Sequence, residues 1–229
     1  MLPLLLRLGF WQLERAEEKQ QLNSVIAQQH QLPPVTKINQ YPGADLQYRK
    51  IQLQGYFDQQ RYWLLDNKTR QGRVGYEVIV PFVDSSGATI LINRGWIAAS
   101  PMRSEIPIVD LAKGMRRIEG FAYQPSHNVM TGNTHAESVV KGSEWPKRIQ
   151  KVDIADLYRQ LNMDPKVSYL LRLETFSDAA LVTQWRWINS SPQKHHGYAV
   201  QWFAMASVLL VALLFANSNL AQVLRQRMQ

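Results

Sequence analysis

The chain has 229 residues, of which 45% are hydrophobic and 19% are charged. This balance provides enough apolar side chains for a packed core, so it excludes a disordered chain and favours one main folded body. Basic residues outnumber acidic ones by 26 to 18, but they are scattered, without an RNA-binding motif or a zinc-finger spacing, so no nucleic acid is expected as a partner. The absence of cysteine excludes disulfides and thiolate nucleophiles.

The chain begins with an apolar stretch and turns polar at Gln12. The apolar stretch is too short to cross a bilayer, and no small-residue cleavage site follows it. We therefore interpret residues 1–11 as the remnant of an N-terminal transmembrane helix whose beginning is missing, with Trp11 and Gln12 at the membrane boundary. An interfacial foot lying on the membrane is the alternative. Residues 12–31 are expected to continue as a helix that ends before Pro33.

The middle of the chain carries runs that are typical of β-strands, with alternating apolar or β-branched residues. The predicted strands cover residues 48–56, 61–65, 75–83, 89–96, 117–123 and 167–173. Residues 84–87 predict a hairpin turn, and the polar residues 124–147 predict a loop. Residues 153–161 have helical spacing, with Asp153 as the N-cap. These elements predict an antiparallel sheet with one short helix.

The longest apolar run covers residues 198–216 and contains no charged side chain. Nineteen helical residues reach roughly 28 Å, which matches the hydrocarbon thickness of a bilayer. Tyr198 and Trp202 lie at its upstream edge, where aromatic rings favour the headgroup layer, and Arg225 and Arg227 follow it and favour a cytoplasmic C-terminus. The run therefore predicts a transmembrane helix, and the alternative is a buried helix of a soluble protein.

Together these elements predict an α+β fold, with an antiparallel β-rich extracytoplasmic domain and flanking helices. A C-terminal transmembrane helix and the remnant of an N-terminal one anchor it. The predicted divisions are residues 1–11 for the truncated first transmembrane helix, 12–194 for the periplasmic domain, 195–217 for the last transmembrane helix with its interfacial edge, and 218–229 for a cytoplasmic tail.

Four short segments stand out, and their order makes them specific. They are Leu8-Gly9-Phe10-Trp11-Gln12-Leu13-Glu14-Arg15 with Lys19; Leu65-Asp66-Asn67-Lys68-Thr69-Arg70 with Gly75-Tyr76; Leu91-Ile92-Asn93-Arg94-Gly95-Trp96; and His195-His196-Gly197-Tyr198-Ala199-Val200-Gln201-Trp202-Phe203-Ala204-Met205-Ala206. As an ordered set, they resemble the Surfeit locus protein 1 family of cytochrome c oxidase assembly factors. The resemblance extends from Leu8 to Ala206.

The resemblance implies two transmembrane helices in the bacterial inner membrane and a large periplasmic domain between them. It also implies a role in delivering haem a to oxidase subunit I, with a contribution of His195 to haem binding. The expected partners are therefore subunit I of cytochrome c oxidase, the haem a synthesis machinery and the lipid bilayer. A haem-independent scaffold that stabilises an oxidase assembly intermediate is the alternative from a different class.

The residues around His195 are compatible with a haem site. Haem iron takes a histidine ligand, and Tyr198 and Trp202 would offer flat apolar surfaces while Lys194 offers a cation. His196 is a competing ligand, and an ordinary polar cluster at the membrane surface is the alternative interpretation.

Arg94 at the end of a strand could pair with a carboxylate or a haem propionate, or form a structural salt bridge, and Trp96 is expected to fill the core. Neither a nucleophile elbow, a zinc helix, a phosphate loop nor a dinucleotide fingerprint occurs in the sequence, so a non-enzymatic protein is expected. An unrecognised periplasmic hydrolase is the remaining alternative. His127 and His135 do not have a recognised metal-ligand spacing and are interpreted as loop residues, so no metal is expected apart from haem iron.

Overall fold

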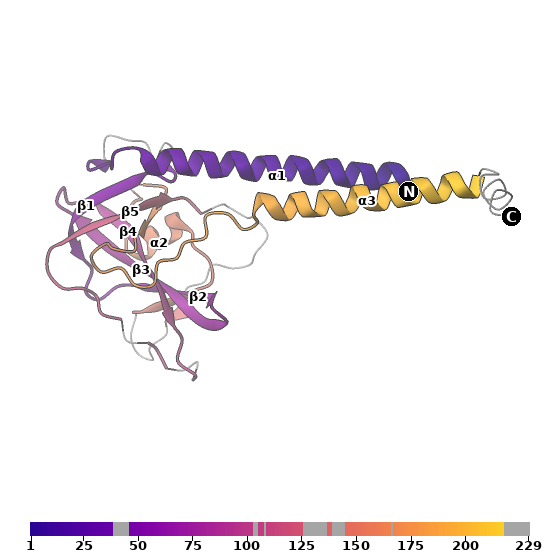
Figure 1. The fold of residues 1–229 in the computed structure, drawn as a ribbon. Coiled ribbons are helices and arrows are strands. Elements are labelled where there is room, and N and C mark those ends of the chain that lie inside the picture. Colours follow the sequence, from indigo (N-terminus) through magenta and orange to yellow (C-terminus); the bar gives the residue numbers. More distant parts are fainter. Residues whose placement is uncertain are drawn as a thin grey trace. The chain divides into compact units, whose positions relative to one another are not determined.

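The computed structural model describes residues 1–38, 46–102, 105–107, 109–125, 137–138, 145–165 and 167–217. The chain divides into a helical unit, Met1–Ala27 with Arg186–Gln229, and a sheet unit, Gln28–Trp185. The elements shown in Figure 1 are α1 (Leu2–Gln31), β1 (Lys50–Phe57), β2 (Trp63–Arg70), β3 (Arg73–Asp84), β4 (Thr89–Ala98), β5 (Arg116–Tyr123), β6 (Glu137–Ser138), β7 (Lys147–Ile149), α2 (Ile154–Gln160), β8 (Leu170–Leu173) and α3 (Pro192–Asn217).

The strands of the sheet unit form one sheet in the order β1-β5-β8-β4-β3-β2-β7-β6, and β1 also pairs with β3. This additional pairing closes β1, β5, β8, β4 and β3 into a ring, from which β2, β7 and β6 extend. Most neighbours are antiparallel, as predicted, but β2 with β7 and β4 with β8 are parallel. Each parallel pair is separated by a long connection along the chain, which parallel pairing requires.

The ring closes where β1 bends between two partners. Gly55 pairs with Asp84 of β3 and also with Arg116 of β5. A Cβ atom at this position would overlap the carbonyl oxygen of Val83 and lie 2.8 Å from the Cα of Asp84. Only glycine allows the two backbones to approach this closely, so Gly55 is a requirement of the closed ring.

Two apolar clusters cover opposite faces of β3 and β4. Val78, Val80 and Phe82 belong to one cluster, whereas Ile79 belongs to the other, which also contains residues of α2. Successive residues of a strand point to opposite faces, so a strand covered on both sides is apolar at every position. This explains why these segments lack the polar alternation seen in β5.

Two local signals of the sequence are confirmed, and one region differs. Asp153 caps α2 by accepting a hydrogen bond from the backbone N–H of Asp156 at 3.1 Å. The turn at 84–87 joins β3 to β4 as expected. The predicted loop at 124–147 contributes two short strands, β6 and the start of β7, although most of it lies outside the described residues. Strands of two or three residues are too short for a period-two pattern to reveal them.

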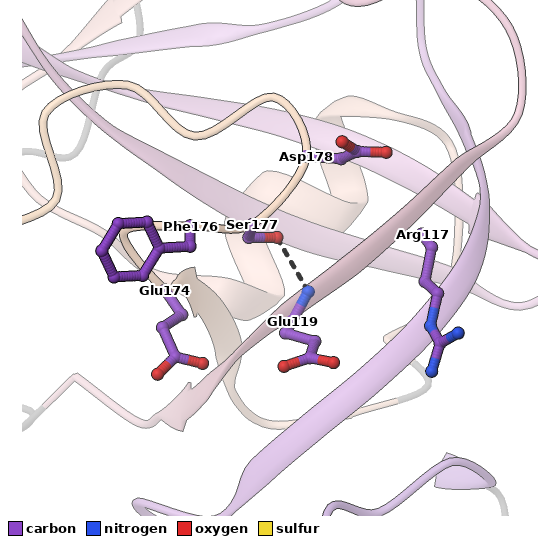
Figure 2. A pocket seen from close by; sticks show the side chains of 6 residues that line it. All are labelled: Arg117, Glu119, Glu174, Phe176, Ser177 and Asp178. Carbon is purple, nitrogen blue, oxygen red and sulfur yellow. Dashed lines mark hydrogen bonds between the residues drawn. The ribbon is translucent and has the colours of Figure 1, made fainter.

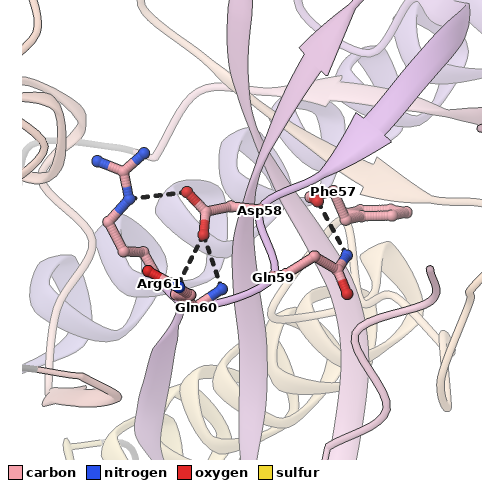
Figure 3. A network of polar contacts seen from close by, with 5 residues as sticks. All are labelled: Phe57, Asp58, Gln59, Gln60 and Arg61. Carbon is pink, nitrogen blue, oxygen red and sulfur yellow. Dashed lines mark hydrogen bonds and ion pairs between the residues drawn. The ribbon is translucent and has the colours of Figure 1, made fainter. Parts of the chain in front are cut away.

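The connection from β1 to β2 is organised by the carboxylate of Asp58 (Figure 3). It accepts hydrogen bonds from the backbone N–H groups of Gln60 and Arg61, both at 2.8 Å, and from Nε of Arg61 at 2.7 Å. Burial raises the pKa of Asp58, but these donors and the positive charge lower it more, so the net pKa lies below its ordinary value. The side chain of Gln59 donates to the carbonyl of Phe57 at 3.0 Å.

The helical unit contains two long helices that run antiparallel and side by side (Figure 1). The predicted division between residues 11 and 12 falls inside α1, which is continuous from Leu2 to Gln31. Among the described residues, one helix is long and apolar enough to cross a membrane: the segment Pro192–Ala216 of α3, whose most apolar 18-residue window has a mean hydropathy of 2.2. It contains the predicted apolar run.

Candidate functional site

His195 lies near the beginning of α3, on the face turned toward α1. Its Nδ1 is 2.8 Å from the side-chain oxygen Oε1 of Gln12. The other ring nitrogen, Nε2, is buried and has no hydrogen-bond partner among the described residues. Gln12 is itself only 9% exposed and His195 is partly buried, so this polar contact lies between the two helices.

Small residues allow α1 and α3 to approach each other around this pair. Gly9 and Ala16 are buried on α1, and Ala199 and Ala206 are buried on α3. A Cβ on Gly9 would lie 2.6 Å from the ring of Phe203, and that ring makes an edge-to-face contact with Phe10 at 5.2 Å between centroids. Positions 9, 12 and 16 of α1 and 192, 195, 199, 202, 206 and 209 of α3 follow the three-and-four spacing of a helix-packing seam.

The two aromatic residues predicted beside His195 lie on the same side of α3, because helical positions three and seven apart share a face. Trp202 is partly buried in the seam, whereas Tyr198 is 50% exposed. The structure therefore brings His195, Tyr198 and Trp202 together on one side of α3, with Gln12 as an additional partner.

His196, the competing ligand, has different surroundings. It is exposed and lines an open groove of about 550 Å³ between the two helices. The other lining residues come from α1: Leu13, Glu17, Gln20, Gln21 and Ser24. One carboxylate and three polar side chains line this groove, and Leu13 is the one aliphatic residue among its lining residues.

Arg94 belongs to the sheet unit and uses its donors on the backbone. It is 3% exposed, and its Nε donates to the carbonyl of Ala179 at 2.7 Å. Its Nη1 donates to the carbonyl of Asp110, and the guanidinium lies 5.3 Å from the ring centre of Phe57. Burial lowers the pKa of Arg94, an effect that the Asp110 carboxylate partly opposes. These contacts give Arg94 a structural role in joining loops to β4.

The other residues of the segment 93–96 also make contacts within the sheet unit. Asn93 donates to the carboxylate of Glu77 at 2.7 Å and accepts from the backbone N–H of Gly95 at 3.1 Å. Gly95 adopts a φ of 117°, which glycine allows, where β4 has a bulge against β3. The Trp96 indole donates to the carbonyl of Lys68 at 2.7 Å and is 8% exposed, which confirms its predicted place in the core.

The four segments that stood out in the sequence thus meet in pairs. The first and fourth segments meet in the helical unit, through Gln12 and His195. The second and third meet in the sheet unit, through Lys68 and Trp96, and the Trp96 ring also covers Gly75. The first pair joins segments 183 residues apart, whereas the second pair lies on strands that follow one another along the chain.

A groove of about 480 Å³ in the sheet unit was not predicted (Figure 2). Two of its carboxylates have partners, because Glu174 pairs with Lys50 at 2.8 Å and Glu119 accepts a hydrogen bond from Gln52. Ser177 fixes the rim by accepting the backbone N–H of Glu119 at 2.8 Å, and the side chain of Phe176 is 97% exposed beside it. The groove therefore presents the exposed ring of Phe176, while the carboxylates of Glu174 and Glu119 are already paired within the protein.

Sequence reasoning missed Gln12 as a partner of His195 and assigned it to the membrane boundary. The signal was present in the spacing, because Gln12 lies on the same stripe of α1 as the small residues Gly9 and Ala16. A polar residue between two small ones on a buried stripe indicates a contact with another helix. His127 and His135 lie outside the described residues.

Comparisons with known proteins show which family the chain matches. A family model described as the SURF1 family matches residues 1–207, which include both pairs of segments. The chain is 23% identical over 225 residues to a SURF1-like protein of Rickettsia felis, covering 96% of this chain and 95% of that protein. It is 31% identical over 104 residues to a SURF1-like protein of Dictyostelium discoideum, covering 41% of this chain and 38% of that protein.

The name of a third relative describes a function. The chain is 30% identical over 95 residues to the cytochrome oxidase assembly protein SHY1 of Saccharomyces cerevisiae, covering 40% of this chain and 24% of that protein. The chain thus spans about a quarter to two fifths of the yeast and Dictyostelium proteins and nearly all of the Rickettsia protein. The match to the family model confirms the resemblance that the four segments predicted.

Proposed function

The chain belongs to the SURF1 family, and we propose on this premise that it is a non-enzymatic assembly factor of cytochrome c oxidase. The name of the yeast relative supports this role. We further propose that the chain holds haem a transiently and assists its insertion into oxidase subunit I. Its partners would be subunit I, the machinery that synthesises haem a, and the lipid bilayer.

The proposed location is the bacterial inner membrane, with α3 as an anchor. The segment Pro192–Ala216 has the required length and hydropathy, and only 11% of its most apolar window is buried. Many of its exposed residues, among them Val200, Val208 and Phe215, are apolar and are therefore suited to contact lipid. Arg225 and Arg227 favour a cytoplasmic C-terminus, which supports a periplasmic location for the sheet unit.

His195 is the residue that carries the haem proposal. Its Nδ1 is engaged by Gln12, so Nε2 is the nitrogen available to iron, which is the arrangement of histidine ligands in metal sites. Tyr198 and Trp202 lie on the same side of α3 and would contact the apolar porphyrin, and Lys194 is exposed beside them for a propionate. Because Nε2 is buried, iron can reach it only if the side chains that cover this nitrogen move aside.

The test is haem absorbance of the full chain purified from a host that makes haem a. The proposal predicts haem bound to the wild-type protein, strong loss in His195→Ala, and retention in His196→Ala, since His196 lines the polar groove instead. A wild-type protein that never carries haem, or equal loss in both variants, would count against His195 as the ligand.

The haem-independent scaffold is a second candidate because it accounts equally well for two observations. The buried Nε2 and the contact with Gln12 are also what a purely structural helix pair would show. This alternative predicts that the chain co-purifies with an oxidase subunit and that His195→Ala leaves both that complex and the oxidase content of the membrane unchanged.

A further inference from the structure

We propose that Gln12 is a positioning residue that holds the His195 imidazole in the tautomer that ligates iron, and that its neutral amide keeps the ligand weak enough for release. This inference rests on the proposed haem-binding function. It starts from the 2.8 Å contact between Gln12 Oε1 and His195 Nδ1.

The chemistry of the amide fixes the direction of this hydrogen bond. A side-chain carbonyl oxygen can only accept, so His195 Nδ1 must carry the hydrogen and donate it. In a neutral imidazole the second nitrogen then holds the free electron pair, which places that pair on Nε2. Nε2 is buried and has no hydrogen-bond partner in the part of the chain that the structure describes, so no donor there competes for this electron pair.

The surroundings of Gln12 favour its hydrogen bond with His195. Gln12 is 9% exposed and lies on the stripe of α1 that contains Gly9 and Ala16. These small neighbours bring α3 close enough for an imidazole on one helix to reach an amide on the other. A long polar side chain at a closely packed seam would be costly to bury unless it were hydrogen-bonded.

An amide at position 12 also affects how strongly His195 would bind iron, which matters for a carrier that must release haem. A carboxylate at position 12 would also accept from Nδ1, but its negative charge would make the imidazole more basic and a stronger iron ligand. A neutral acceptor orients the ring without this added strength. Glutamine therefore suits transient binding better than glutamate does.

The first experiment reads the tautomer without haem. The full chain, labelled with ¹⁵N-histidine in detergent micelles at pH 8, is examined by long-range ¹H–¹⁵N correlation, with His195→Ala identifying the His195 signals. Wild type and Gln12→Glu should show a protonated Nδ1 and an unprotonated Nε2. Gln12→Leu should show a mixture of tautomers, and Gln20→Leu, a matched glutamine-to-leucine change on α1, should match wild type. A protonated Nε2 in the wild-type protein would overturn the inference whether or not haem binds.

The second experiment titrates the same variants with ferric haem. Gln12→Leu should weaken binding about tenfold or more, the loss typical of removing such a partner, while Gln12→Glu should bind more tightly and release haem more slowly. If His195→Ala binds haem as well as wild type, the proposed ligand is wrong. If His195→Ala loses haem but both Gln12 variants bind as wild type does, only the positioning role of Gln12 is overturned.

Discussion

Replacing Arg94 should destabilise the sheet unit strongly, because its guanidinium supplies two buried hydrogen bonds to backbone carbonyls. In Arg94→Ala the carbonyls of Ala179 and Asp110 would both lose their donor. At about 1.5–3 kcal/mol for each hydrogen bond to a charged group, the loss is about 3–6 kcal/mol, a large part of the free energy of unfolding of an ordinary domain. Arg94→Lys keeps the charge, but its three donors sit on a single nitrogen that cannot reproduce the planar guanidinium spanning both carbonyls, so it should recover about half of this loss.

The matched control is Arg70, which also donates twice to another segment, at 3.3 Å and 3.0 Å to the side chain and backbone of Gln184, but in an exposed setting. Water can replace those bonds, so Arg70→Ala should cost less than about 1 kcal/mol. The assay is urea unfolding of the full chain in detergent, followed by tryptophan fluorescence. If Arg94→Ala is no less stable than Arg70→Ala, the reasoning from burial is wrong, and Arg94 becomes available as a binding residue.

Four further substitutions test the sheet unit by the same assay. Gly55→Ala should prevent closure of the ring and unfold the unit, whereas Gly87→Ala, where a Cβ meets nothing within 4 Å, should cost only about 1 kcal/mol from its positive φ. Tyr158→Phe should cost about 1–3 kcal/mol, because the carbonyl of Thr89 would lose the hydroxyl that donates to it at 2.8 Å, and no measurable loss would refute this. Burial lowers the pKa of His30 below 6.5, so the unfolded chain binds a proton more readily than the folded one. The free energy of unfolding should therefore fall as the pH drops from 6.5 through this lowered pKa, and His30→Gln should remove that part of the pH dependence.

The sequence predicted the elements with local signals. The six predicted strands are all present, and the apolar run at 198–216 lies within α3. The closed ring of strands could not be predicted in this way. The pairing of β1 with β3 depends on a close backbone approach at Gly55, and the apolar pattern of a strand does not indicate which strand it pairs with. The parallel pairs β2–β7 and β4–β8 were missed for a related reason, since pairing direction follows from the path of the chain in space.

The candidate site was predicted in part. His195, Tyr198 and Trp202 could be grouped from their spacing, because all three lie on one helix. The partner of His195 could not be found in this way, because Gln12 lies at the other end of the chain. Arg94 was considered for propionate binding, but its buried donors engage backbone carbonyls that no sequence pattern could have indicated.

Vibrational spectroscopy decides whether His195 is the iron ligand of a transient haem carrier. The full chain would be loaded with haem a and reduced, and its resonance Raman spectrum compared between natural-abundance and ¹⁵N-histidine protein. If His195 ligates the iron, the spectrum should contain an iron–imidazole band that shifts with the isotope. This band should persist in His196→Ala and disappear in His195→Ala. A band that persists in His195→Ala, or a haem complex without any histidine signature, would contradict this assignment.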